Sequence, residues 1–251
     1  MLTPIKFWFN PKPGVIEVSG RDRVQFLQNV LTNDIKGLAP GMETEACLLT
    51  AQAKIVAVTK VQCFDHYLWL ICDYPMKNQL LKALEKLIIM EDVELKDLTE
   101  SHPIKLEPNE QVDLETLEIM RIAFAIPKYG VDYDESNIPL ECGLEHTISF
   151  TKGCFPGQEI IARLDSRGGV AKKLSGLVIK GEVAPKKNDR ILDNGAEVGQ
   201  ITSAAFLPML KKTVALGYLK KESWTVGHPL VVEIEKDQIP ARVEELPFYS
   251  K

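Results

Sequence analysis

The sequence has no cysteine pairing of the kind that a structural zinc site needs. Its five cysteines show no C-x-x-C spacing and no Cys/His cluster, so we expect reduced thiols, no metal site and a cytosolic protein. Charged residues interrupt the longest apolar stretch, near residues 80–90, which excludes a membrane span there. The opening MLTPIKFWFNPKPG is too short in apolar residues and too broken by proline for a signal peptide.

Positive charge is not in excess either. The 30 Lys and Arg residues face 35 Asp and Glu residues, a net charge of −5, which predicts no direct nucleic-acid binding. Residues 171–251 are nevertheless at +3, which leaves −8 for residues 1–170. A solvated surface explains such a difference, and an anionic ligand held between the two parts is the alternative. With 45% hydrophobic and 26% charged residues, the chain has the composition of an ordinary soluble globular protein.

The first 100 residues have the pattern of an α+β unit. Alternation predicts a strand at 15–19, and apolar spacing predicts a helix within 21–31. Further along we expect a hairpin of strands 55–64 and 67–72, a helix from about 75 to 90, and a strand at 93–96. This hairpin, helix and strand together suit a ferredoxin-like unit.

The rest of the chain changes character twice. A polar, proline-bearing stretch at 101–111 suggests a crossing between domains, and residues 114–122 follow it with partly helical spacing. From residue 171 onward short β-rich runs recur between glycines, at 174–179, 190–192, 198–203, 214–219, 230–234 and 241–243. Short strands with turn signals at this density predict a small β-barrel.

Residues 150–174 contain the chemistry-bearing segment. Lys152 lies two residues before Cys154, and Gly153, Pro156 and Gly157 force a loop. Residues 158–164 are expected to form one or two helical turns. A thiol close to a lysine and a helix N-terminus has its thiolate favoured, so Cys154 is a candidate reactive cysteine.

Other interpretations of this segment remain open. A lone cysteine often only packs, so a solvent-reachable sulfur would favour reactivity and an enclosed one would favour packing. His146 has no evident carboxylate partner, which leaves a Cys/His hydrolase weakly supported. The Arg167-Gly168-Gly169 turn either offers an anion its guanidinium and amides or simply joins two strands.

The run at 152–159, KGCFPGQE, resembles the K-G-C-[YF]-x-G-Q-E signature of the YgfZ family, folate-binding proteins related to the glycine-cleavage T-protein. Softer resemblances to the same group cover positions 20–22, 26–28, 31–34, 121–127, 130, 132, 137–139, 141, 163 and 167–168. The resemblance therefore extends over essentially the whole chain, with a specific centre.

This resemblance implies an α+β, T-protein-like fold. Two interleaved ferredoxin-like domains and a C-terminal β-barrel would surround a central folate channel. The implied boundaries are 1–46 with 101–170 for the first folate-binding domain, 47–100 for the inserted ferredoxin-like domain, and 171–251 for the barrel.

It also implies a tetrahydrofolate-binding accessory protein that supports assembly or repair of iron–sulfur enzymes, including those that modify tRNA. Its partners would be folate and, transiently, the client enzymes. Cys154 would be the essential residue, with Lys152 tuning it. The folate-contacting residues implied are Arg121, Gly157, Gln158, Glu159, Arg163 and Arg167. One cysteine cannot hold a cluster alone, so its thiol would act as a transient ligand or a redox group.

Departures from the T-protein pattern shape the alternatives. The T-protein pattern over the stretch that aligns with residues 116–125 is A-R-D-x-L-R-x-E-x-G. This chain departs from it at four positions, and only Arg121 matches it cleanly. The residues at the Arg, Asp, Glu and Gly positions of the pattern are, in order, Leu117, Glu118, Ala123 and Ala125. These departures therefore favour folate binding without turnover over aminomethyl transfer. An aminomethyltransferase of the T-protein type is the second hypothesis, and a folate-binding module whose cysteine only packs is the third.

Overall fold

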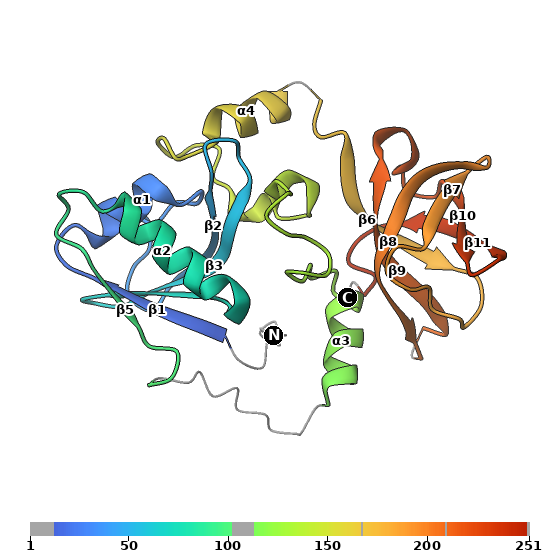
Figure 1. Cartoon of the computed structure of the whole chain (residues 1–251), viewed down its shortest axis with the longest axis horizontal. Helices are drawn as coiled ribbons and strands as arrows, with labels where there is room; N and C mark the ends of the chain where they lie inside the picture. Colours follow the sequence, from blue (N-terminus) through green and yellow to red (C-terminus); the bar gives the residue numbers. More distant parts are fainter. Residues whose placement is uncertain (1–12, 102–112, 167, 209, 250–251) are drawn as a thin grey trace. The chain divides into compact units, whose positions relative to one another are not determined.

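The computed structural model describes residues 13–101, 113–166, 168–208 and 210–249, and these fall into two compact units (Figure 1). The sheet unit comprises residues 13–101, 135–139, 144–166 and 168. The barrel unit comprises residues 113–134, 140–143, 169–208 and 210–249. The N-terminal stretch 1–12, nearly all of the predicted crossing at 101–111, and Arg167 lie outside the described residues. The domain boundaries stated above stay a prediction.

The sheet unit is built on five antiparallel strands in the order β2-β3-β4-β1-β5. They are β1 (Pro13–Ser19), β2 (Glu43–Leu49), β3 (Ile55–Cys63), β4 (Leu68–Asp73) and β5 (Glu94–Asp97). Burial alternates strictly along β3, because successive side chains of a strand point to opposite faces. The predicted β3–β4 hairpin is confirmed.

Helices of the sheet unit follow the predicted apolar spacing. They are α1 (Arg23–Val30), α2 (Lys77–Leu87) after a 3-10 turn at Tyr74–Met76, a 3-10 turn at Glu145–Thr147, and α4 (Gln158–Ser166). Leu80 and Leu84 of α2 are fully buried, and the helix packs on β1 and β3. The prediction placed the end of this helix near Met90, whereas it ends at Leu87, because the next residues form a turn whose N–H groups bond to a side chain.

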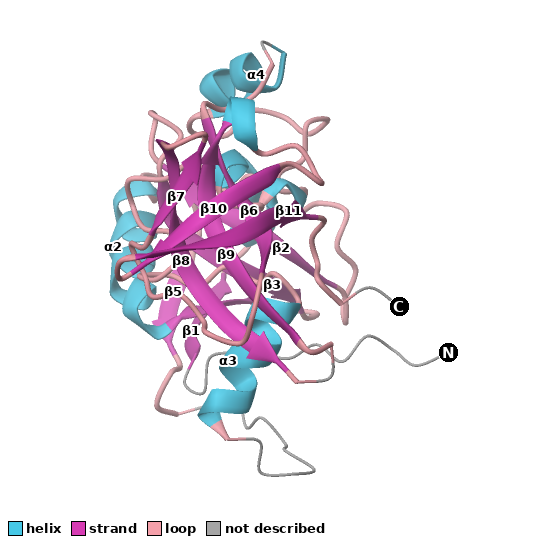
Figure 2. Ribbon diagram, turned by 90° about the vertical axis from the view of Figure 1, so that its right-hand side faces the viewer, coloured by secondary structure: helices cyan, strands magenta, loops and turns pink. Residues whose placement is uncertain are grey.

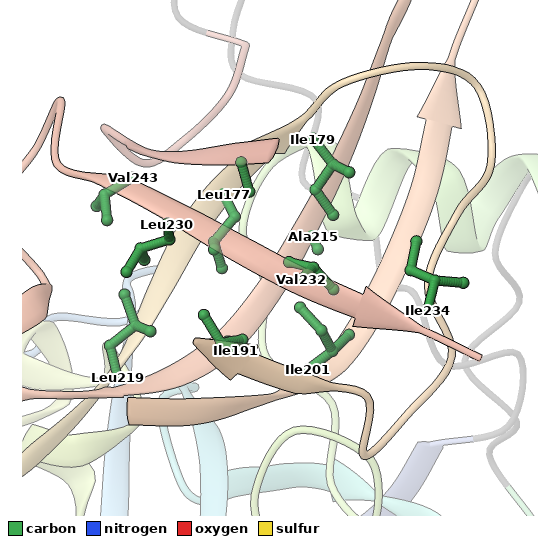
Figure 3. Close-up of a cluster of buried hydrophobic side chains, with 11 residues drawn as sticks. Leu177, Ile179, Ile191, Ile201, Ala215, Leu219, Leu230, Val232, Ile234 and Val243 are labelled. Carbon is green, nitrogen blue, oxygen red and sulfur yellow. The ribbon is translucent and has the colours of Figure 1, made fainter. Parts of the chain in front are cut away.

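The predicted barrel is confirmed as six antiparallel strands in the closed order β10-β11-β6-β9-β8-β7 (Figure 2). They are β6 (Lys172–Ile179), β7 (Arg190–Asp193), β8 (Ala196–Leu207), β9 (Lys212–Lys220), β10 (Pro229–Ile234) and β11 (Asp237–Glu244), with a 3-10 turn at Lys221–Ser223. Leu177, Ile191, Leu219 and Val232 belong to a cluster of buried aliphatic side chains that fills the interior (Figure 3). A barrel of this size is closed by side-chain packing.

One helix, α3 (Leu114–Ala123), covers part of the outside of the barrel. Asp113 caps its N-terminus by accepting from the Thr116 N–H at 2.7 Å, as short polar side chains do before a helix. Ile122 packs with Leu174 and Leu216 in a second buried cluster on that side. Within the described parts of both units, no helix combines the length and the apolar character that crossing a bilayer requires.

Candidate functional site

Thr32 follows Leu31, the C-cap residue of α1. Its hydrogen bonds connect three segments of the sheet unit. Its buried hydroxyl donates to the Thr147 carbonyl at 2.7 Å and accepts from the Cys47 N–H at 2.8 Å. Its carbonyl accepts from the Ser149 N–H at 3.0 Å. The backbone that leads into residues 149–159, called the motif segment below, is therefore fastened to β2 and to the end of α1.

Lys152 is the second anchor of the motif segment. Its ammonium donates to the carbonyls of Gln28 and Leu31, at the C-terminal end of α1, and lies 5.4 Å from the centre of the Phe155 ring. A cation suits this end of a helix, because unpaired carbonyls carry partial negative charge there. Burial lowers the pKa of Lys152 to about 8, and the charge of Asp34 opposes that shift. The Lys152 ammonium thus contacts the end of α1 and an aromatic ring.

Gly157 is the third anchor, and its position requires glycine. Its φ of +81° is one that L side chains rarely adopt, and a Cβ there would lie 2.8 Å from both the Ala53 Cα and the Thr50 carbonyl oxygen. The segment therefore packs backbone to backbone against the β2–β3 turn. The Gly157 carbonyl then accepts from Ile161 N at 3.2 Å, in the first turn of α4.

Cys154 lies between these anchors and is exposed. Its neighbour Phe155 is buried, so the chain is held at the residue beside the thiol while the sulfur reaches solvent. The other four cysteines are buried: Cys47, Cys63, Cys72 and Cys142. Burial raises the pKa of Cys47 to about 12, an environment that keeps a thiol protonated and inert. Cys154 is thus the accessible thiol among the five.

The first turns of α4 present the predicted polar side chains. Glu159 and Arg163 are exposed and Gln158 is half-buried, while Ile161 is buried against the unit. A carboxylate in the first turn of a helix is favourable next to the free N–H groups. No ion pair joins Glu159 to Arg163 within the described chain. The predicted contribution of Arg167 falls outside the described residues.

Arg121 belongs to the barrel unit and is almost completely buried, with 1% of its surface exposed. Its guanidinium donates to Asp132 at 2.6 Å, to Glu118 at 2.6 Å, to the Ser203 hydroxyl at 2.7 Å and to the Ile126 carbonyl at 2.8 Å. Burial alone would lower the pKa of Arg121, but these carboxylates raise it above its ordinary value. Of the three guanidinium nitrogens of Arg121, only Nε has no hydrogen-bond partner among the described residues.

A β-bulge in β8 completes this network. The β8–β9 register shifts between Ile201 and Ser203, so Thr202 and Ser203 both reach one oxygen of Asp132. Neighbouring residues of a regular strand would point to opposite faces, and a bulge re-aims one of them. Arg121 therefore holds α3 to the barrel through Asp132, and the sequence alone indicated neither the bulge nor this anchoring.

His146 and Glu45 form a contact that the sequence analysis missed. His146 Nε2 lies 2.7 Å from a Glu45 carboxylate oxygen, which raises the pKa of His146 above its ordinary value. The statement that His146 lacks a carboxylate partner was therefore wrong, because the partner lies 101 residues away on β2. Asn33 bridges the same segments, since its Nδ2 lies 2.7 Å from the Glu45 carbonyl and 3.2 Å from that of His146.

The structure thus brings together two stretches that the sequence analysis singled out separately, residues 31–34 and the motif segment. The contacts are those of Thr32 and Lys152 described above. Within the described ranges, no three His, Cys, Asp or Glu side chains are grouped to hold a metal ion. The candidate site therefore offers an exposed cysteine on an anchored loop, followed by a helix with exposed polar side chains.

Comparisons with known proteins agree with this architecture. Residues 172–250 match the family model of the glycine cleavage T-protein C-terminal barrel domain. An aminomethyltransferase from Halothermothrix orenii is 33% identical over 120 residues, which is 48% of this chain and 33% of that protein. An aminomethyltransferase from Synechococcus sp. is 36% identical over 133 residues, 53% of this chain and 37% of that protein. The matched region spans little more than a third of the relatives' length.

A solved structure extends the likeness to nearly the whole chain. Glycine cleavage system aminomethyltransferase T from Bartonella henselae superposes with a TM-score of 0.84 and 17% identity, covering 95% of this chain and 84% of that one. At that identity the likeness concerns the fold. The chain therefore has a T-protein-like, mixed α+β fold with a C-terminal six-stranded barrel, as predicted.

Proposed function

We propose that this protein is a tetrahydrofolate-binding, YgfZ-like accessory protein that supports the assembly or repair of iron–sulfur enzymes, including those that modify tRNA. The observation that carries the proposal is the exposure of Cys154, within the K-G-C-F-P-G-Q-E run, on a segment anchored at Lys152 and Gly157. Sites that need a fixed reactive group gain from such anchoring, because little ordering remains to be done when a partner arrives.

The thiol count limits the part that Cys154 can play. Iron–sulfur clusters are normally held by several thiolates, and the other cysteines are buried. Cys154 therefore acts together with a client protein, as a transient ligand or a redox thiol. The cluster is the client's cargo in this scheme.

The residues present fit folate in part. An anionic glutamyl tail needs an accessible cation, and Arg163 on α4 is exposed, next to the exposed carboxylate Glu159. Arg121 does not fit a two-pronged carboxylate clamp, because its terminal nitrogens already bond to protein groups. When bound, folate would supply its one-carbon chemistry, and the role of this chain would be to bind and orient it through α4.

The cysteine role is tested in cells that lack the native protein. Cys154→Ala and Cys154→Ser are expected to fold normally and yet fail to restore the methylthiolated tRNA base, measured by mass spectrometry of digested tRNA. Thr151→Ala, an exposed change on the same segment, is the matched control and should restore it. Full restoration by Cys154→Ala would refute the proposal and favour a folate-binding module whose cysteine only packs.

Aminomethyl transfer is the second candidate, and the aminomethyltransferase names of the relatives favour it. It predicts glycine-dependent formation of methylene-tetrahydrofolate when the purified chain is mixed with the other glycine-cleavage subunits. The non-matching positions Leu117, Ala123 and Ala125 argue for no turnover in that assay. Turnover that survives Cys154→Ala would establish the transferase.

A further inference from the structure

The turn between α2 and β5 exposes two large apolar side chains. Ile89 is 83% exposed and Met90 is 93% exposed, the two largest values among the exposed large apolar residues of the described chain. Figure 1 shows this turn beside the start of α1. We call Ile89 and Met90 the apolar tip. Single exposed apolar residues are ordinary, whereas neighbouring ones that form a contiguous exposed patch can mark an interaction site.

The conformation of the tip is fixed from within. One carboxylate oxygen of Glu91 accepts from Ile89 N at 2.9 Å and from Met90 N at 3.0 Å. These backbone hydrogen bonds lower the pKa of Glu91 below its ordinary value. A carboxylate that occupies two successive N–H groups leaves that stretch of backbone little freedom. The side chains of the tip therefore project from a defined turn.

The base of the tip is held by the turn at residues 20–22. Arg21 Nε donates to the Asp92 carboxylate at 2.5 Å, Asp92 N donates to the Asp22 carboxylate at 2.8 Å, and Asp22 N donates to the Asp92 carbonyl at 3.2 Å. Gly20 has a φ of +98°, and a Cβ on it would lie 2.1 Å from the Asp92 carbonyl oxygen. The G-R-D turn thus forms a socket for the tip.

The charges around the tip indicate what it can meet. Residues 85–94 carry Glu85, Glu91, Asp92 and Glu94 against Lys86, a local net charge of −3. An anionic lipid surface is repelled by such a frame. A pocket of about 330 Å³ in the barrel unit contains Leu246 and Phe248, but Glu244, Glu245 and Lys212 also line it. The tip of a second copy would meet like charge there.

We propose that the apolar tip docks into a protein partner through an apolar pocket edged by lysine or arginine. Resting on the proposed function, that partner is the iron–sulfur client enzyme, and the tip holds it while Cys154 does its chemistry. The rigid tip lowers the ordering cost of docking, and the acidic frame selects a basic rim. The tip and Cys154 are then separable: one contributes affinity and the other contributes chemistry.

The test uses the full-length protein and a purified tRNA methylthiotransferase immobilised for biolayer interferometry. Ile89→Asp and Met90→Asp are each expected to weaken binding at least tenfold, while Met90→Leu stays within twofold of the unchanged protein. Val183→Asp is the matched control, since Val183 is 67% exposed on the barrel unit, and should bind unchanged. Binding should also weaken as salt rises. Equal melting temperatures and equal Cys154 alkylation rates would show that the variants remain folded.

Several outcomes overturn the docking proposal. These are unchanged client binding by both tip variants, or no direct binding by a protein that still supports tRNA methylthiolation in cells. Tip-dependent flotation with phosphatidylcholine–phosphatidylglycerol vesicles, or tip-dependent self-association in sedimentation, would also overturn it. Failure of the proposed function is recognised separately, because cells that lack the protein would then show no dependence of methylthiolation on Cys154.

Discussion

The motif segment and the Arg121 network were singled out by the same family pattern, and the structure treats them in opposite ways. Cys154 is exposed, with its anchors placed at Lys152 and Gly157 on either side. Arg121 is buried, and its charge is met by two carboxylates and a hydroxyl. A residue can thus match a motif because it reaches a ligand or because it holds an element in place. Exposure and unused bonding capacity separate the two cases.

The largest effect that we expect is the difference in reactivity between Cys154 and the four buried cysteines. Iodoacetamide should modify Cys154 in the native protein, while the four buried cysteines should react at least about a hundredfold more slowly, through local opening. Peptide mass spectrometry after timed quenching gives the five rates. In urea at full unfolding, the five rates should converge. Comparable native rates for Cys154 and Cys142 would remove the distinction on which the proposed function depends.

Arg121→Met is expected to give the largest loss of stability. It leaves the fully buried carboxylate of Asp132 without its cation, a change that typically costs about 3–5 kcal/mol. Urea unfolding followed by circular dichroism and tryptophan fluorescence measures the loss. The control is Glu118→Gln, whose carboxylate is 39% exposed and which should cost about 1 kcal/mol or less. Similar losses for both would mean that Asp132 is stabilised without Arg121.

Gly157→Ala separates conformational strain from backbone contact. The positive φ costs about 1–2 kcal/mol in a left-handed backbone, and displacement of the Thr50–Ala53 turn adds to it, so we expect about 2 kcal/mol or more. Gly41→Ala is the matched control, because Gly41 has a φ of +85° and no atom within 4 Å of its Cβ position. Urea unfolding compares the two. Equal losses would show that the contact with the turn contributes nothing.

Lys152→Met should have the smallest effect and a distinctive pH dependence. Loss of the helix-end contact should speed hydrogen exchange of residues 149–157 by about fivefold, for about 1 kcal/mol. Because burial lowers the pKa of Lys152 from 10.5 to about 8, the unfolded chain binds more protons between these values. The free energy of unfolding of the unchanged protein should therefore gain a rising component from about pH 8 to 10.5.

Lys152→Met should remove that rise, and Lys82→Met, on an exposed position of α2, should keep it. Urea midpoints at pH 7, 8, 9 and 10 give the comparison. A rise of equal size in Lys152→Met would place its origin in another group.

Much of the local structure was predictable from residue pattern. Apolar spacing placed α1 and most of α2, alternation placed the β3–β4 hairpin, and short β-rich runs between glycines placed the barrel strands. The end of α2 was misplaced because Ile88, Ile89 and Met90 continue an apolar run. The Glu91 carboxylate accepts hydrogen bonds from the N–H groups of Ile89 and Met90, and the chain turns there. Apolar spacing reports only side-chain polarity, whereas the end of α2 depends on one hydrogen-bond acceptor.

The candidate site divides in the same way. The motif alone named Cys154 and Lys152 as candidate site residues and predicted a loop at Gly157, and the site roles stay a prediction. The pairing of His146 with Glu45 was not predicted, because 101 residues separate them and neither lies in a recognisable motif. The acceptors of Lys152 were equally hidden, since backbone carbonyls belong to every residue and leave no trace in a sequence.

By itself, the sequence determined the periodic elements, the identity of the motif and the choice of thiol, because these depend on residue types at short spacing. The tertiary structure alone decided that Cys154 is exposed while four other cysteines are buried, and that Arg121 is occupied by Asp132 and Glu118. Burial and partner choice arise when distant segments pack together. The free energy of each such contact depends on groups that lie far apart in the sequence.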